Sequence, residues 1–225
     1  GAKVLGRADG STLGTVGGGA LEHLATRRAL GLLAVQSSAY LRYCLGDGDA
    51  VEGEEPTGML CGGRAALFFE YLGQPLRVYL YGAGHVGQAL ARALRPLGAY
   101  VTAIDPRPEV LAQLPEARRT VPQDYVEALA GEAVLPGGYH VISTPGHASD
   151  YEVLRALLTG DLAPRYVALV ASRRKAASLL ERLREEAGDV DTGALYTPAG
   201  LDLGGSTPAA VALSIAAEIQ AVHHG

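Results

Sequence analysis

The sequence has few of the residues and runs on which several classes of protein depend. Its 225 residues include two cysteines, Cys44 and Cys61, which are too few for a disulfide-bonded scaffold and fit a reducing compartment. The most apolar stretch, residues 203–217, is interrupted by glycine, proline and serine and is too short to span a bilayer. A net charge of −5 argues against binding to nucleic acid or to an anionic membrane surface. We therefore expect a cytoplasmic protein that has no membrane span and binds no nucleic acid.

Residue spacings typical of zinc sites and hydrolases are also absent. The sequence has no H-x-x-x-H, H-E-x-x-H or C-x-x-C motif, so we expect no preformed metal site. It has no Ser-His-Asp arrangement and no nucleophile elbow.

Glycine, in contrast, is abundant. The 30 glycines are close to twice the ordinary usage, yet they follow no G-X-Y period, which excludes a collagen-like chain. Apolar residues make up 48% of the chain, which excludes a disordered linker. Because glycine permits positive φ angles and close approach of a ligand, the excess predicts loops that bind through their backbone.

The hydrophobic pattern predicts an α/β protein with two domains, at residues 1–73 and 76–225. The first is a small mixed α/β domain, with strands expected at 2–7, 12–15, 37–45 and 64–72, a helix at 20–35 and an acidic loop at 46–63. The second has strands expected at 77–81, 100–104, 119–121, 140–143 and 166–170, and helices at 84–97, 149–158, 174–187 and 207–222. Alternation of strand and helix predicts a parallel, Rossmann-like sheet in this domain.

A G-x-G-x-x-G motif, Gly82, Gly84 and Gly87, follows the first strand of the second domain and begins a helix. The first glycine makes the tight turn, the second lets a pyrophosphate approach, and the third lets the helix pack on the strand. Free N–H groups at the helix start favour an anion. Asp105 ends the next strand, where a carboxylate typically accepts from ribose hydroxyls and disfavours a 2′-phosphate. The alternative is a nucleotide-type fold with an empty or repurposed crevice.

Further polar residues are expected at the same edge of the sheet, because ligands of open parallel sheets bind outside the carboxyl ends of the strands. His147 and Asp150 follow one strand, and Arg173, Arg174 and Lys175 follow another. The three cations are candidate phosphate partners, and the alternative is a solvated first turn of a helix. His85 and His147 are candidates to polarise a substrate, move a proton or bind a metal, or are simply hydrogen-bonding loop residues.

Two features of the first domain also suggest a site. Cys61 precedes two glycines, so its thiol is a candidate to carry a persulfide or contact a soft metal, and the alternative is a small buried residue at a strand edge. Cys44 lies within a predicted strand and is expected in the core. The loop Thr15–Gly19 precedes a helix and is a second possible anion cradle.

Taken in order, the motifs form a recognisable series. They are Gly14-Thr15-Val16-Gly17-Gly18-Gly19-Ala20-Leu21-Glu22, Cys61-Gly62-Gly63 with Glu70, Gly82-Ala83-Gly84-His85-Val86-Gly87, Asp105-Pro106-Arg107, Gly146-His147 with Asp150, Ser172-Arg173-Arg174-Lys175, and Pro198-Ala199-Gly200-Leu201-Asp202-Leu203-Gly204 with Thr207-Pro208. The series resembles the xanthine dehydrogenase accessory protein family, XdhC/CoxI, over nearly the whole chain. The sequence departs from the family pattern at Pro145, Ala171 and Ser206.

The resemblance implies a helper protein rather than an enzyme. It implies a carrier that binds the molybdenum cofactor (molybdopterin or its dinucleotide) between the domains, for sulfuration and insertion into a molybdenum hydroxylase. The implied partners are an apo-hydroxylase of the xanthine dehydrogenase type and a cysteine desulfurase, and we expect a homodimer. The residues assigned to the cofactor are Gly17, Gly18, Gly19, Gly82, Gly84, His85, Gly87, Asp105, Arg107, His147, Asp150, Arg173, Arg174, Lys175 and Asp202, with Cys61 as the candidate sulfur or metal contact. The alternatives are an NAD-dependent oxidoreductase and a docking protein with a vestigial fold.

Overall fold

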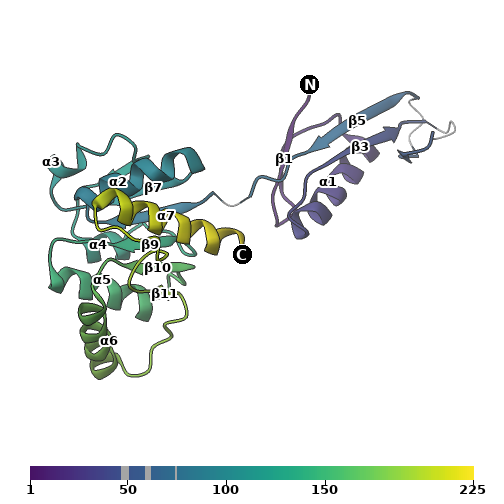
Figure 1. Ribbon diagram of the computed structural model, residues 1–225. Helices are drawn as coiled ribbons and strands as arrows, with labels where there is room; N and C mark the ends of the chain where they lie inside the picture. The colour runs from purple at the N-terminus through teal and green to yellow at the C-terminus, as the bar shows by residue number, and fades with distance from the viewer. Residues whose placement is uncertain (47–50, 59–61, 74) are drawn as a thin grey trace. The chain divides into compact units, whose positions relative to one another are not determined.

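The computed structural model describes residues 1–46, 51–58, 62–73 and 75–225. The chain divides into two compact units, Gly1–Gln74 and Pro75–Gly225. Each unit has its own β-sheets, and Figure 1 shows both units with their elements labelled.

The N-terminal unit combines two small sheets and one helix. Its elements are β1 (Val4–Gly6), β2 (Thr12–Gly14), α1 (Gly19–Ala34), β3 (Ala39–Cys44), β4 (Glu54–Pro56) and β5 (Arg64–Phe69). β1 and β2 form an antiparallel hairpin. The other three strands form a sheet in the order β4-β3-β5, in which β3 is antiparallel to β5 and parallel to β4. The predicted helix is present, shifted by one residue, and the four predicted strands are present with somewhat shorter bounds.

The prediction of an uninterrupted loop at residues 46–63 is wrong, because β4 lies within it. β4 has no apolar alternation that would reveal it as a strand. Its pairing with β3 is supported instead by tertiary contacts: Arg64 Nε lies 2.9 Å from Glu54 Oε1, and the Thr57 hydroxyl donates to the Cys44 carbonyl at 2.8 Å. Cys44 is buried, as expected.

The C-terminal unit is built on one six-stranded parallel sheet in the order β11-β10-β9-β6-β7-β8. The strands are β6 (Arg77–Tyr81), β7 (Tyr100–Ile104), β8 (Arg119–Val121), β9 (Tyr139–Ile142), β10 (Tyr166–Leu169) and β11 (Leu195–Tyr196). The helices are α2 (His85–Leu94), α3 (Pro108–Leu111), α4 (Tyr125–Ala130), α5 (His147–Thr159), α6 (Arg173–Ala187) and α7 (Pro208–His224), and a 3₁₀ turn spans Arg95–Leu97. The predicted α/β class with a Rossmann-like parallel sheet is confirmed.

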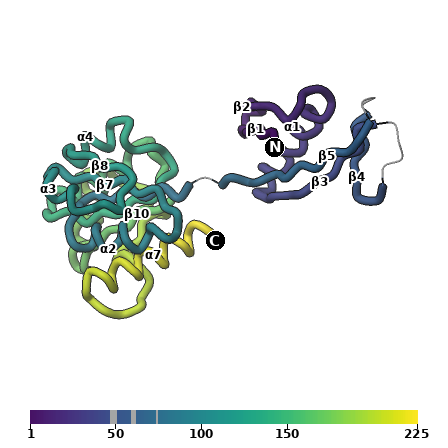
Figure 2. The backbone as a smooth tube through the Cα atoms, turned by 90° about the horizontal axis from the view of Figure 1, so that it is seen from above, coloured from purple at the N-terminus to yellow at the C-terminus, as the bar shows by residue number. Residues whose placement is uncertain are grey.

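Helices cover both faces of this sheet, as Figures 1 and 2 show. Alternate residues of β6 separate the two cores: Val78 and Leu80 pack with α2 and α7, whereas Tyr79 and Tyr81 pack with α4, α5 and α6. The strand order changes direction between β6 and β9, because β7 and β8 extend the sheet on one side and β10 and β11 on the other. In such sheets a ligand binds outside the carboxyl ends of the strands at this point.

Local sequence explains where several helices begin and end. α7 begins after Thr207, whose hydroxyl accepts from the Ala210 N–H, with Pro208 at the first helical position, as predicted. α2 was expected to reach residue 97 but ends at Leu94, because Pro96 has no N–H to continue the helix and the chain tightens into the 3₁₀ turn. Among the described residues, no helix is both long enough and apolar enough to cross a membrane.

Candidate functional site

The glycine loop between β6 and α2 combines close packing with one open position. Gly82 has a φ of +106°, and a Cβ there would lie 2.3 Å from the Ser143 carbonyl oxygen. A Cβ on Gly87 would lie 2.3 Å from the Gly82 carbonyl oxygen. A Cβ on Gly84, in contrast, would meet no atom within 4 Å. Gly82 and Gly87 are therefore required by the fold, whereas Gly84 leaves space above the loop.

No side chain caps the N-terminus of α2, and its first turn contains no acidic residue. The backbone N–H groups at this end are therefore available to a ligand, and the helix dipole favours an anion there. His85, the first residue of α2, is exposed.

Asp105 lies at the end of β7 and is completely buried. Its Oδ2 accepts from the Ala83 N–H at 2.9 Å and from Arg107 Nη2 at 2.8 Å. Its Oδ1 accepts from the Arg107 backbone N–H at 3.0 Å and from Arg107 Nε at 2.8 Å. Burial alone would raise the pKa of this carboxyl, but hydrogen bonds from Arg107 and Ala83 bring the pKa below its ordinary value.

Both oxygens of Asp105 are thus already engaged by the protein. A role as acceptor for a ligand hydroxyl stays a prediction, and it would require the ligand to displace Arg107. The Arg107 side chain is 42% exposed, and three of its five guanidinium N–H groups are not used in the contact with Asp105.

The loops after β9 and β10 are held together by a second buried carboxylate. Asp150 Oδ1 accepts from the Thr144 N–H at 3.1 Å and from the Thr144 hydroxyl at 2.7 Å. Asp150 Oδ2 forms an ion pair with Lys175 Nζ. The structure therefore brings Asp150 and Lys175 together, but the charge of Lys175 is already balanced by Asp150.

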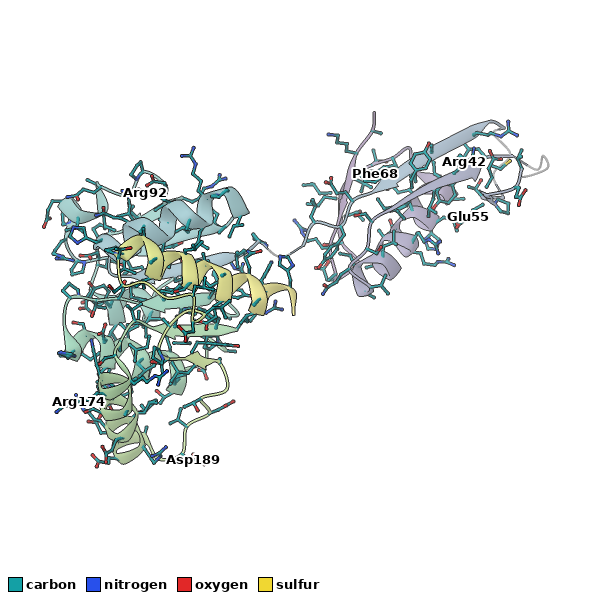
Figure 3. The ribbon with its side chains drawn as sticks, viewed as in Figure 1. Arg42, Glu55, Phe68, Arg92, Arg174 and Asp189 are labelled. Atoms are coloured by element: carbon teal, nitrogen blue, oxygen red, sulfur yellow. The ribbon has the colours of Figure 1, made fainter. Side chains whose placement is uncertain are left out.

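The other two cations at the start of α6 remain exposed. Arg173 and Arg174 form no ion pair within the part of the chain that the structure describes. Arg174, labelled on α6 in Figure 3, lines a pocket of about 340 Å³ together with the exposed His147 and with Ser172. Lys175 also lines this pocket but is paired with Asp150, so Arg174 is the charged side chain there that has donors for an anion.

The predicted anion cradle before α1 is filled by the protein itself. Glu22 Oε2 accepts from the N–H groups of Val16 and Gly18, each at 3.1 Å, and from the Thr15 hydroxyl. These hydrogen bonds, that of Thr15 above all, lower the pKa of Glu22. The Glu22 carboxylate thus occupies the place that the cofactor phosphate was expected to take beside Gly17, Gly18 and Gly19. The structure gives no support to the assignment of these three glycines to a cofactor.

The remaining predicted residues lie away from these contacts. Asp202 is exposed in the loop between β11 and α7, and no hydrogen bond or ion pair joins it to the glycine loop in the described ranges. This loop is anchored to α7 by the Gly200 N–H, which donates to Glu218 Oε2 at 2.9 Å. Cys61 lies outside the described residues. Within those residues, no three His, Cys, Asp or Glu side chains are grouped to hold a metal ion.

Two buried polar side chains were not singled out from the sequence. Tyr125, the first residue of α4, is 5% exposed, and its hydroxyl has no hydrogen-bond partner among the residues described. His140 in β9 is fully buried between Tyr79 and Tyr81, 3.0 Å from the Tyr81 hydroxyl through Nδ1. Burial lowers the pKa of His140 to about 3, so this imidazole is neutral. Neither residue belongs to a sequence motif that would have marked it.

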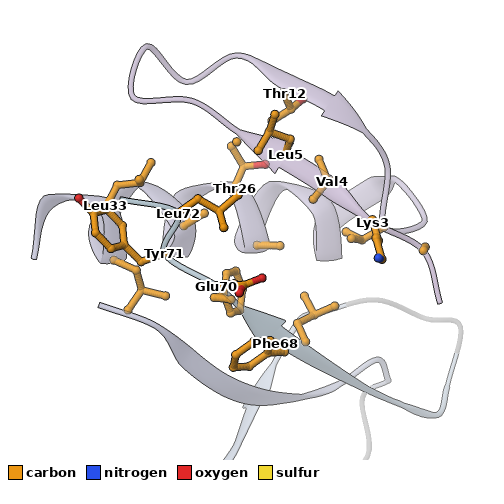
Figure 4. Close-up of a pocket in the computed structure, with 18 of the residues that line it drawn as sticks. Lys3, Val4, Leu5, Thr12, Thr26, Leu33, Phe68, Glu70, Tyr71 and Leu72 are labelled. Carbon is orange, nitrogen blue, oxygen red and sulfur yellow. The ribbon is translucent and has the colours of Figure 1, made fainter. Parts of the chain in front are cut away.

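The N-terminal unit contains a larger pocket of about 700 Å³ (Figure 4). Residues of β1, α1 and β5 line it, among them Val4, Thr26 and Phe68. In the described ranges β1 pairs with β2 alone and β5 with β3 alone, so each keeps one unpaired edge. None of the cofactor residues predicted from the sequence lines this pocket.

The glycine loop at the turning point of a parallel sheet defines the C-terminal unit as a Rossmann-like domain. Residues 78–219 match the family model of the XdhC Rossmann domain, and residues 1–44 match the model of the XdhC and CoxI family. The chain belongs to the XdhC/CoxI family, which confirms the resemblance drawn from the motifs.

Two known proteins are similar to this chain over most of its length. The uncharacterized protein YqeB of Escherichia coli is 30% identical over 224 residues, which is 97% of this chain and 40% of YqeB. The chain thus spans less than half the length of this relative. A crystal structure of a xanthine dehydrogenase from Bacillus halodurans has a TM-score of 0.59, covering 98% of this chain and 85% of the other at 18% identity. At that identity the likeness shows the fold alone.

Proposed function

We propose that this chain is an accessory protein for enzymes of the xanthine dehydrogenase type, and that its Rossmann-like unit binds the molybdenum cofactor. Membership of the XdhC/CoxI family supports the accessory role. The observation that carries the binding site is the open space above Gly84, at a helix N-terminus that no side chain caps. A phosphate-bearing ligand is the group that such a loop suits.

The described residues fit the anionic end of this cofactor. The N–H groups at the start of α2 would hold a phosphate above Gly84, and Arg173 and Arg174 offer further donors at the same edge of the sheet. Asp105 and Asp150 would act indirectly, since each fixes a cation and a loop by hydrogen bonds. When bound, the cofactor supplies the molybdenum centre that a hydroxylase uses, and the chain's residues bind and orient its phosphate end.

An NAD-dependent oxidoreductase is the rival function, motivated by the same glycine loop. The contacts of Asp105 argue against it, because both carboxylate oxygens that a ribose diol would need accept from Ala83 and Arg107 instead. Titration with NAD⁺ to millimolar concentration tests this alternative. A saturable rise in melting temperature would favour the oxidoreductase, and no shift would argue against it.

The partners and the location complete the proposal. We expect an apo-hydroxylase and a cysteine desulfurase as partners, a homodimer, and a cytoplasmic location. Cys61 is the proposed sulfur contact, so a Cys61→Ser variant should still bind the cofactor but yield hydroxylase with less of the sulfurated form. Equal sulfuration by the variant would exclude this role.

The direct test is cofactor binding by the purified chain. The chain is produced in cells that make the molybdenum cofactor, and its molybdenum and pterin content per chain is measured. We expect stoichiometric cofactor in the native chain and little in Gly84→Ala, with Gly31→Ala in α1 as the matched control that retains it. Absence of cofactor from the native chain after exposure to free molybdopterin would contradict the proposal.

A further inference from the structure

The end of β7 is the place where a Rossmann-like domain meets the part of a ligand that lies beyond its pyrophosphate. A carboxylate there recognises a ribose diol, whereas an arginine there accommodates a phosphate. In this chain both groups are present, as Asp105 and Arg107, so the identity of the ligand depends on which one is available.

The hydrogen bonds show that both oxygens of Asp105 are engaged, whereas Arg107 keeps unused donors although its charge is paired with Asp105. Asp105 is completely buried and accepts four hydrogen bonds, three from Arg107 and one from the Ala83 N–H in the glycine loop. Arg107 uses Nε and one N–H of Nη2 for this contact, and the rest of its guanidinium donors remain. Because its side chain is 42% exposed, we expect those donors to be accessible to a ligand at this end of the sheet.

The Tyr125 hydroxyl is a second polar group near this pair. The Tyr125 hydroxyl is buried and has no partner in the described part of the chain. Asp105 and Arg107 are close enough to act on its pKa, which burial above all raises to about 12. A hydroxyl that stays protonated can donate a hydrogen bond, so Tyr125 adds a donor beside Arg107. The nearby carboxylate of Glu109 is exposed at the start of α3 and also acts on the pKa of Arg107, so a phosphate must compete with it.

We infer that the crevice takes a ligand with a phosphate monoester at the β7 end, recognised by Arg107, rather than a dinucleotide with an unmodified ribose there. The inference rests on the proposed function where it concerns the cofactor, for which it favours molybdopterin over its dinucleotide form. Molybdopterin has one phosphate monoester, which would lie between the glycine loop and Arg107, since the Ala83 N–H and Arg107 Nη2 contact the same oxygen of Asp105. Asp105 is then a positioning residue that fixes Arg107 and the glycine loop.

A pair of small nucleotides separates the two kinds of recognition. 2′,5′-ADP and 5′-AMP share the 5′-phosphate that the glycine loop would hold, and they differ in a 2′-phosphate monoester against a free diol. Isothermal titration should show that the native chain binds 2′,5′-ADP at least about tenfold more tightly, as expected for a charge-assisted contact with arginine. Equal affinity for the two ligands would overturn the inference.

Variants show whether Arg107 is the cause. Arg107→Leu should abolish the preference for 2′,5′-ADP and bind 5′-AMP at least as well as before, because it releases Asp105 for the diol. A merely structural arginine would instead weaken both ligands alike. Since Arg107→Leu leaves a buried carboxylate without its cation, the double variant Asp105→Asn/Arg107→Leu serves as the second test, and it should lose the preference without gaining 5′-AMP affinity. Arg155→Leu, on the exposed face of α5, controls for net charge and should keep the preference.

Binding of molybdopterin tests the proposed function separately from the nucleotide preference. Arg107→Leu should weaken molybdopterin binding at least about tenfold if the monoester lies at the β7 end. A chain that binds no molybdopterin yet prefers 2′,5′-ADP would refute the proposed function and leave the phosphate site intact. A chain that binds molybdopterin equally well with and without Arg107 would refute the site and leave the proposed function intact.

Discussion

The glycine loop yields the sharpest prediction, because packing requires glycine at Gly82 and Gly87, whereas Gly84 has room for a side chain. Gly84 has φ −70° and ψ −168°, which alanine adopts without strain, and a Cβ there would touch nothing within 4 Å. Replacing a glycine at a compatible position reduces the entropy of the unfolded chain, which stabilises by about 0.4–1 kcal/mol. Alanine is a poorer N-cap than glycine by a comparable amount. We therefore expect Gly84→Ala to unfold within about 1 kcal/mol of the native chain.

The same methyl group should nevertheless damage ligand binding. It would fill the space through which a phosphate must approach the N–H groups of α2. We expect the affinity for molybdopterin, and for 2′,5′-ADP as a probe, to fall at least about tenfold, which corresponds to about 1.4 kcal/mol. Urea unfolding followed by circular dichroism measures the stability, and isothermal titration measures the affinity.

Gly87→Ala is the matched contrast within the same loop. Its Cβ would lie 2.3 Å from the Gly82 carbonyl oxygen, so the backbone must move and we expect a loss of about 2 kcal/mol or more in the free energy of unfolding. If Gly84→Ala bound its ligands as tightly as the native chain, the glycine loop would not be the ligand cradle. If instead Gly84→Ala lowered the free energy of unfolding as much as Gly87→Ala does, there would be no open space above Gly84.

Three further predictions concern buried polar groups. Lys175→Met should lower the free energy of unfolding by about 3 kcal/mol, because it strands the Asp150 carboxylate, and Asp150→Asn/Lys175→Met should recover most of that loss in urea titration. Tyr125→Phe should raise the free energy of unfolding of the ligand-free chain by about 1 kcal/mol, since it removes a buried hydroxyl without a partner, and a destabilised variant would mean that the hydroxyl is hydrogen-bonded. The pKa of His140 is lowered from 6.5 to about 3, so the unfolded chain takes up a proton that the folded chain does not. Stability should therefore fall as the pH drops from 6.5 toward 3, by about 1 kcal/mol per pH unit, and His140→Gln should remove that part of the slope in unfolding measured across this range.

Elements with a strong local pattern could be predicted from the sequence. β6 and β7 were predicted with their observed bounds, because each is a largely apolar run that is buried after its first residue, and Thr207 with Pro208 marked the start of α7. The short helices α3 and α4 and the strand β11 were not predicted. They contain four, six and two residues, too few for a hydrophobic period to be read.

The candidate site was predictable as a set of residues but not as a set of contacts. The spacing of Gly82, Gly84 and Gly87 indicated the loop, and parallel strands indicated that Asp150 and Lys175 would lie at one edge of the sheet. That these two form an ion pair with each other depends on the packing of α5 and α6, which no local pattern encodes. Likewise, nothing in the sequence near Tyr125 indicates that its hydroxyl is buried without a partner.

A comparison of the two glycine loops suggests which local signal separates a vacant anion site from a filled one. Both loops precede a helix, and both predicted an anion cradle. The first turn of α1 contains Glu22, which reaches back to the N–H groups of Val16 and Gly18 and occupies the cradle. The first turn of α2 contains no acidic residue, and its N-terminus has no side-chain cap. An acidic side chain in the first turn is therefore the feature to check before a glycine loop is assigned to a phosphate, and by that criterion the loop at Gly84 is the one of the two that is left for a ligand.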